Sequence, residues 1–319
     1  MSTLRALITG GAGFIGSHVS DAFIAAGFDV TILDNLSSGR MENIPAAARL
    51  ERLDIGSSEA SRLVREGRFD VLCHLAAQID VRASVADPVE DAGRNILGSL
   101  NLLEAVRSAE HRPRVVFSST GGAVYGDFVA PPSVEDQPKD PESPYGIAKL
   151  SVEYYLAYYA RVHGLDTVVL RYSNVYGPRQ NPDGEAGVVS IFCQRLLANR
   201  PLTVFGTGEQ TRDYVYVGDV AAANVLAAKV PPPLAGRLDE RAFNIGTGVP
   251  TSVLALAKSL QRAAGSVASV QLTPARPGEL QRSFVGIEKA ARVLGWAPRM
   301  KLEAGLAETF RWFKQRSEA

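Results

Sequence analysis

The feature that most constrains the fold is a regular alternation of short strand-like runs with longer helix-like runs. The strand-like runs are apolar on both faces, which is typical of a parallel sheet covered by helices on both sides. They span Arg5–Thr9, Val30–Leu33, Val71–Leu75, Val115–Ser118 and Thr167–Arg171. Strands joined by helices of this length form right-handed βαβ units. We therefore predict an α/β fold with a doubly wound parallel sheet.

A glycine-rich segment joins the first strand to a helix that we expect over Phe14–Ala26. Gly11, Gly13 and Gly16 satisfy the pattern G-x-G-x-x-G, and Gly10 extends it. Glycines at these positions let a pyrophosphate approach the backbone and the free N–H groups at the helix start. The alternative is a turn that only packs the helix on the strand. The motif alone is equally compatible with both.

Asp34 favours the first interpretation because it ends the second strand at about the 20-residue spacing from Gly16 at which an acid binds the ribose of a dinucleotide. A carboxylate there repels a 2′-phosphate, so we expect a Rossmann fold that binds NAD rather than NADP. Arg40 could serve NADP, but it lies beyond a turn and is discounted. Asp54 either contacts the adenine amino group or is a solvated loop residue.

The pattern changes at about Tyr176, and the 319-residue length suits a second, smaller domain. We predict an NAD-binding domain at residues 1–175, to which 214–250 return, and an α+β substrate-binding domain at 176–213 and 251–319. The elements expected in the later part are helices at Val188–Ala198, Glu288–Leu294 and Glu303–Arg316, a strand at Leu202–Phe205, and a run at Ala242–Ile245 that rejoins the first sheet.

Composition excludes several classes of function. Lysine plus arginine and aspartate plus glutamate each number 34, so the net charge is zero and nucleic acid or an anionic membrane is not an expected partner. No uncharged apolar stretch reaches the ~18 residues of a membrane span. The apolar run Ala6–Ile8 is too short for a signal peptide. Cys73 and Cys193 form no CxxC pair, so we expect no disulfide framework, no metal site and a cytoplasmic protein.

A tyrosine and a lysine stand four residues apart at an expected helix start. Ser143 suits the N-cap and Pro144 the first helical position, so Tyr145 and Lys149 share one face of the helix. A neighbouring ammonium favours the phenolate, which suits a base at neutral pH. A surface pair is the plain alternative. The carboxyl end of the fourth strand faces the cofactor crevice, however, where Thr120 could hydrogen-bond the substrate oxygen that Tyr145 deprotonates.

These motifs occur in a fixed order with several others. The set is Gly10–Gly16, Asp34, His74-Leu75-Ala76-Ala77, Ser118-Ser119-Thr120, Tyr145-x-x-x-Lys149, Arg171–Asn174, Tyr176–Arg179, Gly208–Tyr214, Phe243–Gly246 and Arg276–Glu279. It resembles the extended short-chain dehydrogenases/reductases of the NAD-dependent epimerase/dehydratase family, and within them the UDP-glucose 4-epimerase group. The resemblance covers nearly the whole chain.

The resemblance implies reversible 4-epimerisation of a UDP-hexose through a transient 4-keto sugar and bound NADH. It makes Tyr145 the base at the sugar 4-hydroxyl, places Lys149 at the nicotinamide ribose, and places Thr120 at the 4-oxygen. The positions that match cofactor contacts are Gly10, Gly13, Phe14, Ile15, Gly16, Asp34, Asn35, Ser38, Asp54, Ile55, Leu75, Ala76, Ala77, Asn95, Ser118, Tyr145, Lys149 and Tyr172.

The resemblance also implies contacts for the UDP-sugar. The matching positions are Thr120, Asn174, Val188, Thr203, Phe205, Arg212, Arg276, Glu279 and Ser283. Two of them, Arg212 and Arg276, suit a diphosphate, although ordinary surface salt bridges are the alternative.

Three departures from the family pattern bear on the reaction. Ser119-Thr120-Gly121-Gly122 lacks the Asp-Glu pair of 4,6-dehydratases and the glutamate of decarboxylating relatives, which favours simple epimerisation. Ser283 stands where epimerases restricted to non-acetylated sugars carry a tyrosine. We therefore expect turnover of UDP-GlcNAc and UDP-GalNAc beside UDP-glucose and UDP-galactose. Gly286 replaces a frequent aspartate and puts a peripheral contact in doubt.

The family further implies a homodimer, built from helices expected at Asn95–Arg107 and Tyr145–His163. The aromatic residues that would face the partner, or else belong to the core, are Tyr154, Tyr155, Tyr158 and Tyr159. Two rival functions stay open: another NAD-dependent nucleotide-sugar oxidoreductase or dehydratase, acting on a dTDP- or UDP-sugar, and a non-enzymatic NAD-sensing protein. The intact Tyr145, Lys149 and Thr120 set argues against the second rival.

Overall fold

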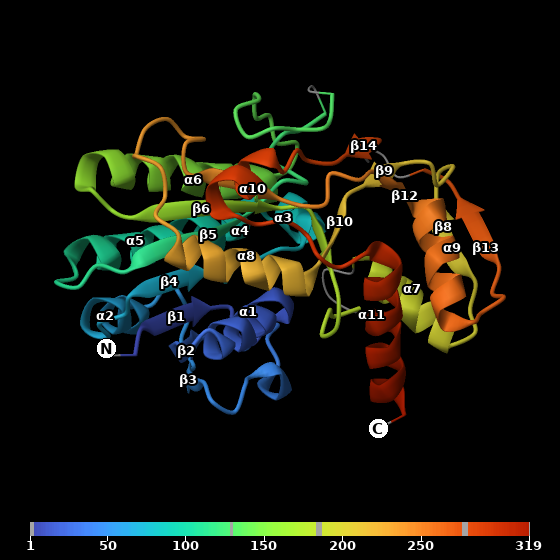
Figure 1. Cartoon of the computed structure of the whole chain (residues 1–319), viewed down its shortest axis with the longest axis horizontal. Helices are drawn as coiled ribbons and strands as arrows, with labels where there is room; N and C mark the ends of the chain where they lie inside the picture. The colour runs from blue at the N-terminus through green and yellow to red at the C-terminus, as the bar shows by residue number, and fades with distance from the viewer. Residues whose placement is uncertain (1–2, 128–129, 183–186, 276–279, 319) are drawn as a thin grey trace.

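In the computed structural model, which describes residues 3–127, 130–182, 187–275 and 280–318, seven strands form one sheet in the larger half of the molecule (Figure 1). The strand order is β11-β6-β5-β4-β1-β2-β3, and every neighbouring pair is parallel. The strands are β1 (Arg5–Thr9), β2 (Asp29–Leu33), β3 (Arg49–Glu51), β4 (Val71–His74), β5 (Arg114–Thr120), β6 (Thr167–Tyr172) and β11 (Ala242–Ile245). All their carboxyl ends therefore meet at one edge.

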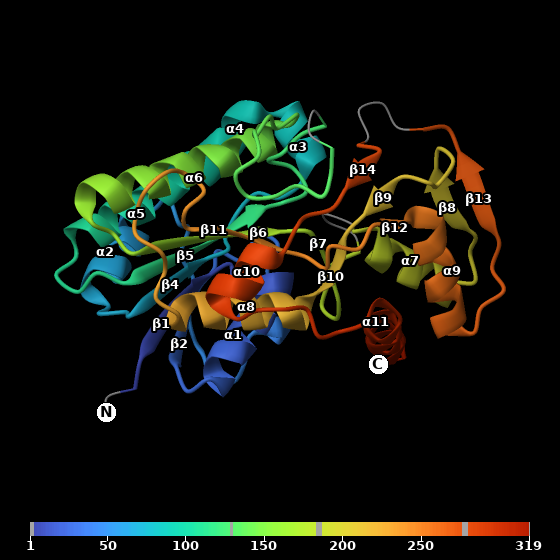
Figure 2. The same cartoon turned by 45° about the horizontal axis from the view of Figure 1, so that its top comes forward.

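Helices cover both faces of this sheet (Figures 1 and 2). One face packs against α1 (Phe14–Ala25), α8 (Val217–Lys229) and α10 (Glu288–Leu294), and the other against α2 (Ser58–Glu66), α5 (Gly98–Ser108) and α6 (Pro144–His163). The shorter helical segments of this half are η1 (Met41–Asn43), α3 (Val81–Ala86), α4 (Pro88–Ala92) and the π-helical turn η2 (Gly93–Leu97). The predicted doubly wound α/β fold is confirmed.

Local chemistry explains where the main helices begin and end. The Ser143 side chain accepts a hydrogen bond from the Gly146 N–H, and Pro144 occupies the first helical turn of α6, as predicted. Gly164 ends α6 in the left-handed region, with a φ of +66°. The predicted α6 start is therefore confirmed.

The smaller half is built from short strands and three helices (Figure 2). Its strand pairs are β7 (Asn174–Tyr176) with β10 (Tyr214–Tyr216), β8 (Leu202–Phe205) with β13 (Val270–Thr273), and β9 (Thr211–Arg212) with both β12 (Thr251–Ser252) and β14 (Arg282–Ser283). The helices α7 (Val188–Leu197), α9 (Val253–Ala264) and α11 (Leu302–Ser317) enclose a separate core. The expected helix at Val188 and strand at Leu202 are both present.

The later segments divide between the halves. Ala242–Ile245 rejoins the large sheet as β11 beside β6, as expected. The strand β10 pairs with β7 outside that sheet, although α8 directly after it covers the sheet. Ala290, Leu294 and Trp296 also pack into the core of the large half, so 251–319 does not lie wholly in the smaller one. The domain boundaries themselves stay a prediction.

The chain crosses repeatedly between the two halves. Crossings lie between β6 and β7 at Ser173–Asn174, before β10 at Asp213, after β11 at Gly246–Gly248, and after β14 at Phe284–Gly286. Figure 2 shows the paired strands β7 and β10 in the middle of the molecule, between the two halves. No helix in the described part of the chain has both the length and the apolar character that a membrane span needs.

Candidate active site

The crevice at the carboxyl edge of the large sheet is the natural place for a ligand. The strand β1 pairs with β2 on one side and with β4 on the other, so the chain leaves β1 in one direction and later returns in the other. Such a reversal of strand order opens a crevice beyond the strand ends. The glycine loop and Asp34 follow strands that end at this edge, and Thr120 is the last residue of β5.

The glycine loop packs closely on the neighbouring strand end. Gly10 has a φ of +69°, and a Cβ there would lie 2.8 Å from the Ala76 nitrogen. A Cβ at Gly16 would clash with the Gly10 carbonyl, whereas one at Gly13 would meet only that carbonyl, at 3.2 Å. The start of α1 has no side-chain cap and no acid in its first turn. The loop therefore packs helix on strand and also leaves the N–H groups of Phe14 and Ile15 for an anion.

Asp34 joins this loop to the end of β2. Its carboxylate is 7% exposed and accepts hydrogen bonds from the Ala12 N–H (3.0 Å) and the Leu36 N–H (2.8 Å). Within the described residues it makes no ion pair, because the Arg40 guanidinium turns to Asn181 (3.3 Å) and Glu42 (3.6 Å). A carboxylate without a cationic partner fits ribose hydroxyls and disfavours a 2′-phosphate.

Four other predicted cofactor residues lie in the loops after β2 and β3. Asn35 donates to Asp54 (2.8 Å), which also accepts from the Gly56 N–H (2.8 Å), so Asp54 is exposed but engaged within its own loop. Ser38 is exposed and Ile55 is buried against α5. The structure brings Asn35 and Asp54 together beyond the ends of β2 and β3, and the adenine contact of Asp54 stays a prediction.

Tyr145 and Lys149 lie on the face of α6 that meets the end of β5. Lys149 is 3% exposed, and its ammonium donates to the Ser118 carbonyl (2.9 Å). The same nitrogen lies 6.0 Å from the centre of the Tyr145 ring and 4.8 Å from that of Phe117. The Tyr145 side chain is half-buried. The buried ammonium is held beside a ring that stays accessible, as a cation that stabilises a phenolate must be.

Thr120 ends β5 and lies near the predicted substrate residue Asn174. The Thr120 Oγ1 and the Asn174 Oδ1 each lie 3.8 Å from the place that a Cβ of Gly122 would take. A Cβ there would make ordinary van der Waals contact with both oxygens, so Gly122 lies beside both polar groups. The structure thus brings a predicted catalytic hydroxyl of the large half together with a predicted substrate contact at the start of β7.

A buried polar relay supports this edge. Its His74 and Asn95 were part of the predicted motif set and cofactor contacts, whereas Thr9 and Ser99 had no predicted role. The Thr9 hydroxyl accepts from the Leu75 and Ala76 N–H groups (3.1 Å each) and so donates to His74 Nδ1 (2.8 Å). His74 Nε2 donates to Ser99 (2.9 Å), which donates to the Asn95 carbonyl (2.5 Å). Burial, together with the Lys149 charge, lowers the pKa of His74 to about 3. The imidazole is therefore neutral.

The relay ends on Asn95, whose amide holds the loop after β4. Its Oδ1 accepts from the Gln78 N–H (2.8 Å), and its Nδ2 donates to the Gln78 carbonyl (2.8 Å) and to Asp91 (3.0 Å). Asn95 thus positions the segment that contains Ala76 and Ala77. The sequence signal for this relay is the histidine at the end of β4, which small residues follow in the chain.

The side chain of Tyr172, a predicted cofactor residue, lies in the core. Its side chain is 5% exposed in the core under α8, and its hydroxyl donates to Asn224 (3.0 Å). Burial raises its pKa well above the ordinary value. The Tyr172 carbonyl accepts from the Gly121 N–H (2.7 Å), so the residue contributes to the crevice through its backbone beside Thr120.

The remaining predicted substrate residues lie in the smaller half. Along β8, Thr203 and Phe205 alternate with the buried Leu202 and Val204, so they face away from the core. Val188 begins α7. Arg212 in β9 and Ser283 in β14 are register partners, which places their side chains next to each other. Arg276 and Glu279 lie outside the described residues.

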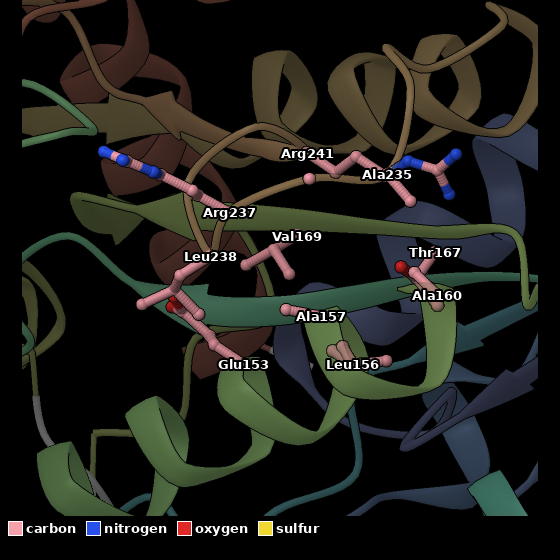
Figure 3. A pocket seen from close by; sticks show the side chains of 11 residues that line it. Glu153, Leu156, Ala157, Ala160, Thr167, Val169, Ala235, Arg237, Leu238 and Arg241 are labelled. Carbon is pink, nitrogen blue, oxygen red and sulfur yellow. The ribbon is translucent and has the colours of Figure 1, made fainter. Parts of the chain in front are cut away.

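A second group of residues, a buried cluster of charged side chains behind β5, had no predicted role in the sequence analysis. Glu153 is four residues beyond Lys149 on α6, is 1% exposed, accepts a bond from Ser119 Oγ, and forms a fully buried ion pair with Arg171 (2.6 Å). Arg171 also pairs with Asp239 (2.8 Å). Figure 3 shows a small pocket at this side of α6, lined by Glu153, Val169, Leu238 and Arg241 among others. In the described part of the chain no cluster of acids, histidines and cysteines suits a metal ion.

Comparison with known proteins agrees with this geometry. A family model described as the NAD dependent epimerase/dehydratase family matches residues 6–246. A UDP-glucose 4-epimerase of Mycolicibacterium smegmatis is 43% identical over 99% of this chain and 100% of its own. The solved UDP-glucose 4-epimerase of Thermotoga maritima with UDP-glucose is 45% identical, with a TM-score of 0.93, and the match covers 98% of this chain and 100% of that one.

A solved UDP-N-acetylglucosamine 4-epimerase of Methanobrevibacter ruminantium, in complex with UDP-N-acetylmuramic acid, is 34% identical. Its TM-score is 0.91, and the match covers 99% of this chain and all of that one. These matches confirm the predicted resemblance, the Rossmann-type fold and an enzyme that uses NAD. With its family model, its fold and its sequence matched over most or nearly all of its length, the chain belongs to the NAD-dependent epimerase/dehydratase family.

Proposed function

We propose that the protein catalyses the reversible 4-epimerisation of a UDP-hexose. The observation that carries the proposal is the convergence at one crevice of the Tyr145–Lys149 pair and Thr120 from the large half with Asn174 from the smaller half. A base, a hydroxyl that can hold the sugar 4-oxygen, and a polar contact for the rest of the substrate are then within reach of a single sugar ring.

The residues that would hold the cofactor are the Gly10–Gly16 loop, Asp34 and Lys149. NAD bound there would accept a hydride from the sugar C4 and return it to the opposite face of the same carbon. Tyr145 would remove the proton of the 4-hydroxyl and give it back after the sugar has turned over. The Lys149 ammonium would stabilise the phenolate in the interval, and Thr120 would keep the 4-oxygen aligned with Tyr145.

The rival reaction, dehydration or another oxidation of a nucleotide sugar, needs an acid that the two residues after Thr120 do not supply. Elimination requires an acid beside the sugar, and the positions after Thr120 are Gly121 and Gly122. A Cβ at Gly121 would lie 3.0 Å from Val285 Cγ1, and at Gly122 only Thr120 and Asn174 are near. Two residues without side chains therefore follow Thr120, which favours a reaction that needs no second proton donor.

The test is an incubation of the purified protein, without added cofactor, with UDP-glucose and UDP-galactose and with a dTDP-sugar. We expect interconversion of the two UDP-hexoses, no net NADH in solution, and release of NAD when the protein is denatured. Accumulation of free NADH or of an unsaturated sugar would favour the rival. Absence of bound NAD together with absence of turnover would remove the proposal.

Acceptance of N-acetylated sugars is the finer part of the proposal. Ser283 is partly buried beside Arg212 and carries only a hydroxymethyl group, which leaves room for an acetamido substituent. The solved UDP-N-acetylglucosamine 4-epimerase with the same fold is consistent with that substrate class. We expect turnover of UDP-GlcNAc by the natural chain and its selective loss in Ser283→Tyr, with Ser283→Ala as the size-matched control. Unchanged selectivity in Ser283→Tyr would contradict this role.

We also propose a homodimer through the α5 and α6 face. Tyr154, Tyr155 and Tyr158 are 58%, 40% and 43% exposed, and Leu97 and Val162 are exposed nearby. Tyr159 instead belongs to the core, where its hydroxyl contacts Glu104. An apolar surface of this kind favours a second copy. Analytical ultracentrifugation should give a dimer that Tyr158→Glu dissociates, whereas a monomeric natural chain would contradict the proposal.

A further inference from the structure

The Asp213 carboxylate lies where the chain segments that cross between the two halves meet. It is 1% exposed and accepts four hydrogen bonds. Its Oδ2 accepts from the Ser173 hydroxyl (3.1 Å) and the Gly248 N–H (3.1 Å), and its Oδ1 from the N–H (2.8 Å) and hydroxyl (2.5 Å) of Thr247. Its own carbonyl accepts from the Asn174 N–H (2.9 Å). One side chain thus joins three crossings.

The junction around Asp213 is closely packed. A Cβ at Gly246 would clash with the Asp213 carboxylate and would lie 2.5 Å from Ser173 Oγ and 2.7 Å from Val285 Cγ2. The fourth crossing, which contains Val285, is therefore pressed against the same point. Within the described residues no cation pairs with Asp213, so its buried charge depends entirely on the four hydrogen bonds.

The candidate substrate contacts are direct chain neighbours of this junction. Arg212 precedes Asp213, and Asn174 follows Ser173. On the other side of the crossing, Tyr172 is the register partner of Thr120 at the end of β5. A shift of Ser173 or Asp213 would therefore change the distance between the substrate contacts of the smaller half and the catalytic hydroxyl of the large half.

We propose that Asp213 is a positioning residue that fixes the two halves at the spacing needed to hold the sugar nucleotide during the reaction. This inference rests on the proposed function. Its hydrogen bonds to Ser173, Thr247 and Gly248 keep Asn174 and Arg212 over the crevice. The carboxylate touches neither substrate nor cofactor and acts through the segments that it joins.

The proposal has a chemical consequence that a purely structural role would lack. A sugar oxidised at C4 has given its 4-hydroxyl proton to Tyr145 and two electrons with a hydrogen to bound NAD. If a loosened junction lets this 4-keto sugar escape, the electrons stay behind, and one reduced nicotinamide remains on the enzyme for each ketone released. The natural chain retains the ketone and returns the electrons to it.

The test compares Asp213→Asn and Ser173→Ala with the natural chain, each purified with its NAD. The amide of Asp213→Asn places an NH₂ group against existing donors, whereas Ser173→Ala removes one arm of the junction and adds no donor. The matched control is Asp219→Asn, a buried carboxylate that accepts from the Met300 N–H (3.0 Å) and has no contact with Ser173 or Thr247. The readouts are kcat, KM, the dissociation constant of UDP by calorimetry, the absorbance of reduced nicotinamide, and Tm.

For Asp213→Asn we expect KM and the UDP dissociation constant to rise about tenfold, a loss of 1.4 kcal/mol in binding. Reduced nicotinamide should accumulate on the enzyme in step with free 4-keto sugar, and Ser173→Ala should show the same changes at smaller size. Asp219→Asn should lower Tm, leave KM unchanged and keep the bound cofactor oxidised. If the Asp213 and Ser173 variants lower only Tm, as the control does, and leave KM, UDP affinity and the oxidised cofactor unchanged, the positioning role is overturned. A natural chain that binds UDP but turns over no UDP-hexose would overturn the proposed function, while the UDP affinities would still judge Asp213.

Discussion

The two halves of the molecule are built in different ways. Each β-strand of the large half except β11 comes from the first 172 residues, and so do its helices apart from α8 and α10. In the smaller half β8 pairs with β13, which places Leu202 beside Val270, and β9 pairs with β14, which places Arg212 beside Ser283. The half that carries the glycine loop is thus made largely from adjacent segments. The half that contains most of the predicted substrate contacts in the described residues is assembled from distant ones.

Removal of the Tyr145 hydroxyl should have the largest effect and should be confined to the chemistry of the large half. We expect Tyr145→Phe to lower kcat roughly 10²–10⁴-fold because the base is lost. Bound NAD and Tm should stay close to those of the natural chain, because phenylalanine keeps the ring of Tyr145 and the backbone N–H of this residue still donates to Ser84. Steady-state kinetics and cofactor release measure both. Turnover within a few-fold of the natural chain would remove Tyr145 from the mechanism.

Breaking the buried ion pair behind β5 should show how far the large half depends on one polar cluster. Glu153→Ala leaves the Arg171 guanidinium buried with only Asp239 as a charged partner, which should cost about 3–5 kcal/mol of the free energy of unfolding. Glu153→Gln keeps the shape and one acceptor and should cost less. Urea denaturation gives both values. A loss in Glu153→Ala below that of Glu153→Gln would contradict this account.

The neutral His74 relay should make the large half sensitive to acid. The folded pKa of His74 is lowered to about 3, so an unfolded chain binds a proton near pH 6.5 that the folded chain refuses. The stability that the neutral His74 contributes is fully present above pH 6.5. It is lost as the pH falls toward 3, where the free energy of unfolding drops by up to about 1.4 kcal/mol per pH unit. His74→Gln should flatten the dependence of unfolding free energy on pH between 6.5 and 5. An equal slope in both chains would contradict the prediction.

The smallest effect should come from a surface contact between the halves. Arg316 at the end of α11 contacts Glu42 of η1, and both side chains are nearly half exposed. Exposed pairs contribute less than about 1 kcal/mol. We therefore expect Arg316→Ala to leave Tm and KM nearly unchanged, in contrast to Asp213→Asn. A fall in UDP affinity comparable to that of the Asp213 variant would show that the periphery, and not the junction, sets the spacing of the halves.

The large half could be predicted well from the sequence because its signals are local. Continuous apolar runs marked β1, β5 and β6, and Ser143 with Pro144 marked the start of α6. The glycine loop follows from the geometry of a single strand–helix turn, and Asp34 from its spacing to Gly16 at the end of the next strand. Tyr145 and Lys149 needed only the helical repeat to be placed on one face.

The remaining features depend on contacts that no local pattern encodes. The strands β9, β12 and β14 have two residues each and exist only through their pairing with one another. The core position of the Tyr172 side chain is set by Asn224 in α8. Asp213 looks in the sequence like an ordinary loop acid after Arg212, and its role became visible only when Ser173 and Thr247 were found beside it.

The pairing of β11 with β6 has a consequence for how the protein is made. A ribosome that has released the first 172 residues has delivered six of the seven strands of the large sheet, yet the edge of β6 stays unpaired until Ala242–Ile245 emerges. During that interval a hydrophobic strand edge is open to any other extended chain. Nascent chains halted between β6 and β11 should therefore engage chaperones, and release from them should coincide with the arrival of Ile245.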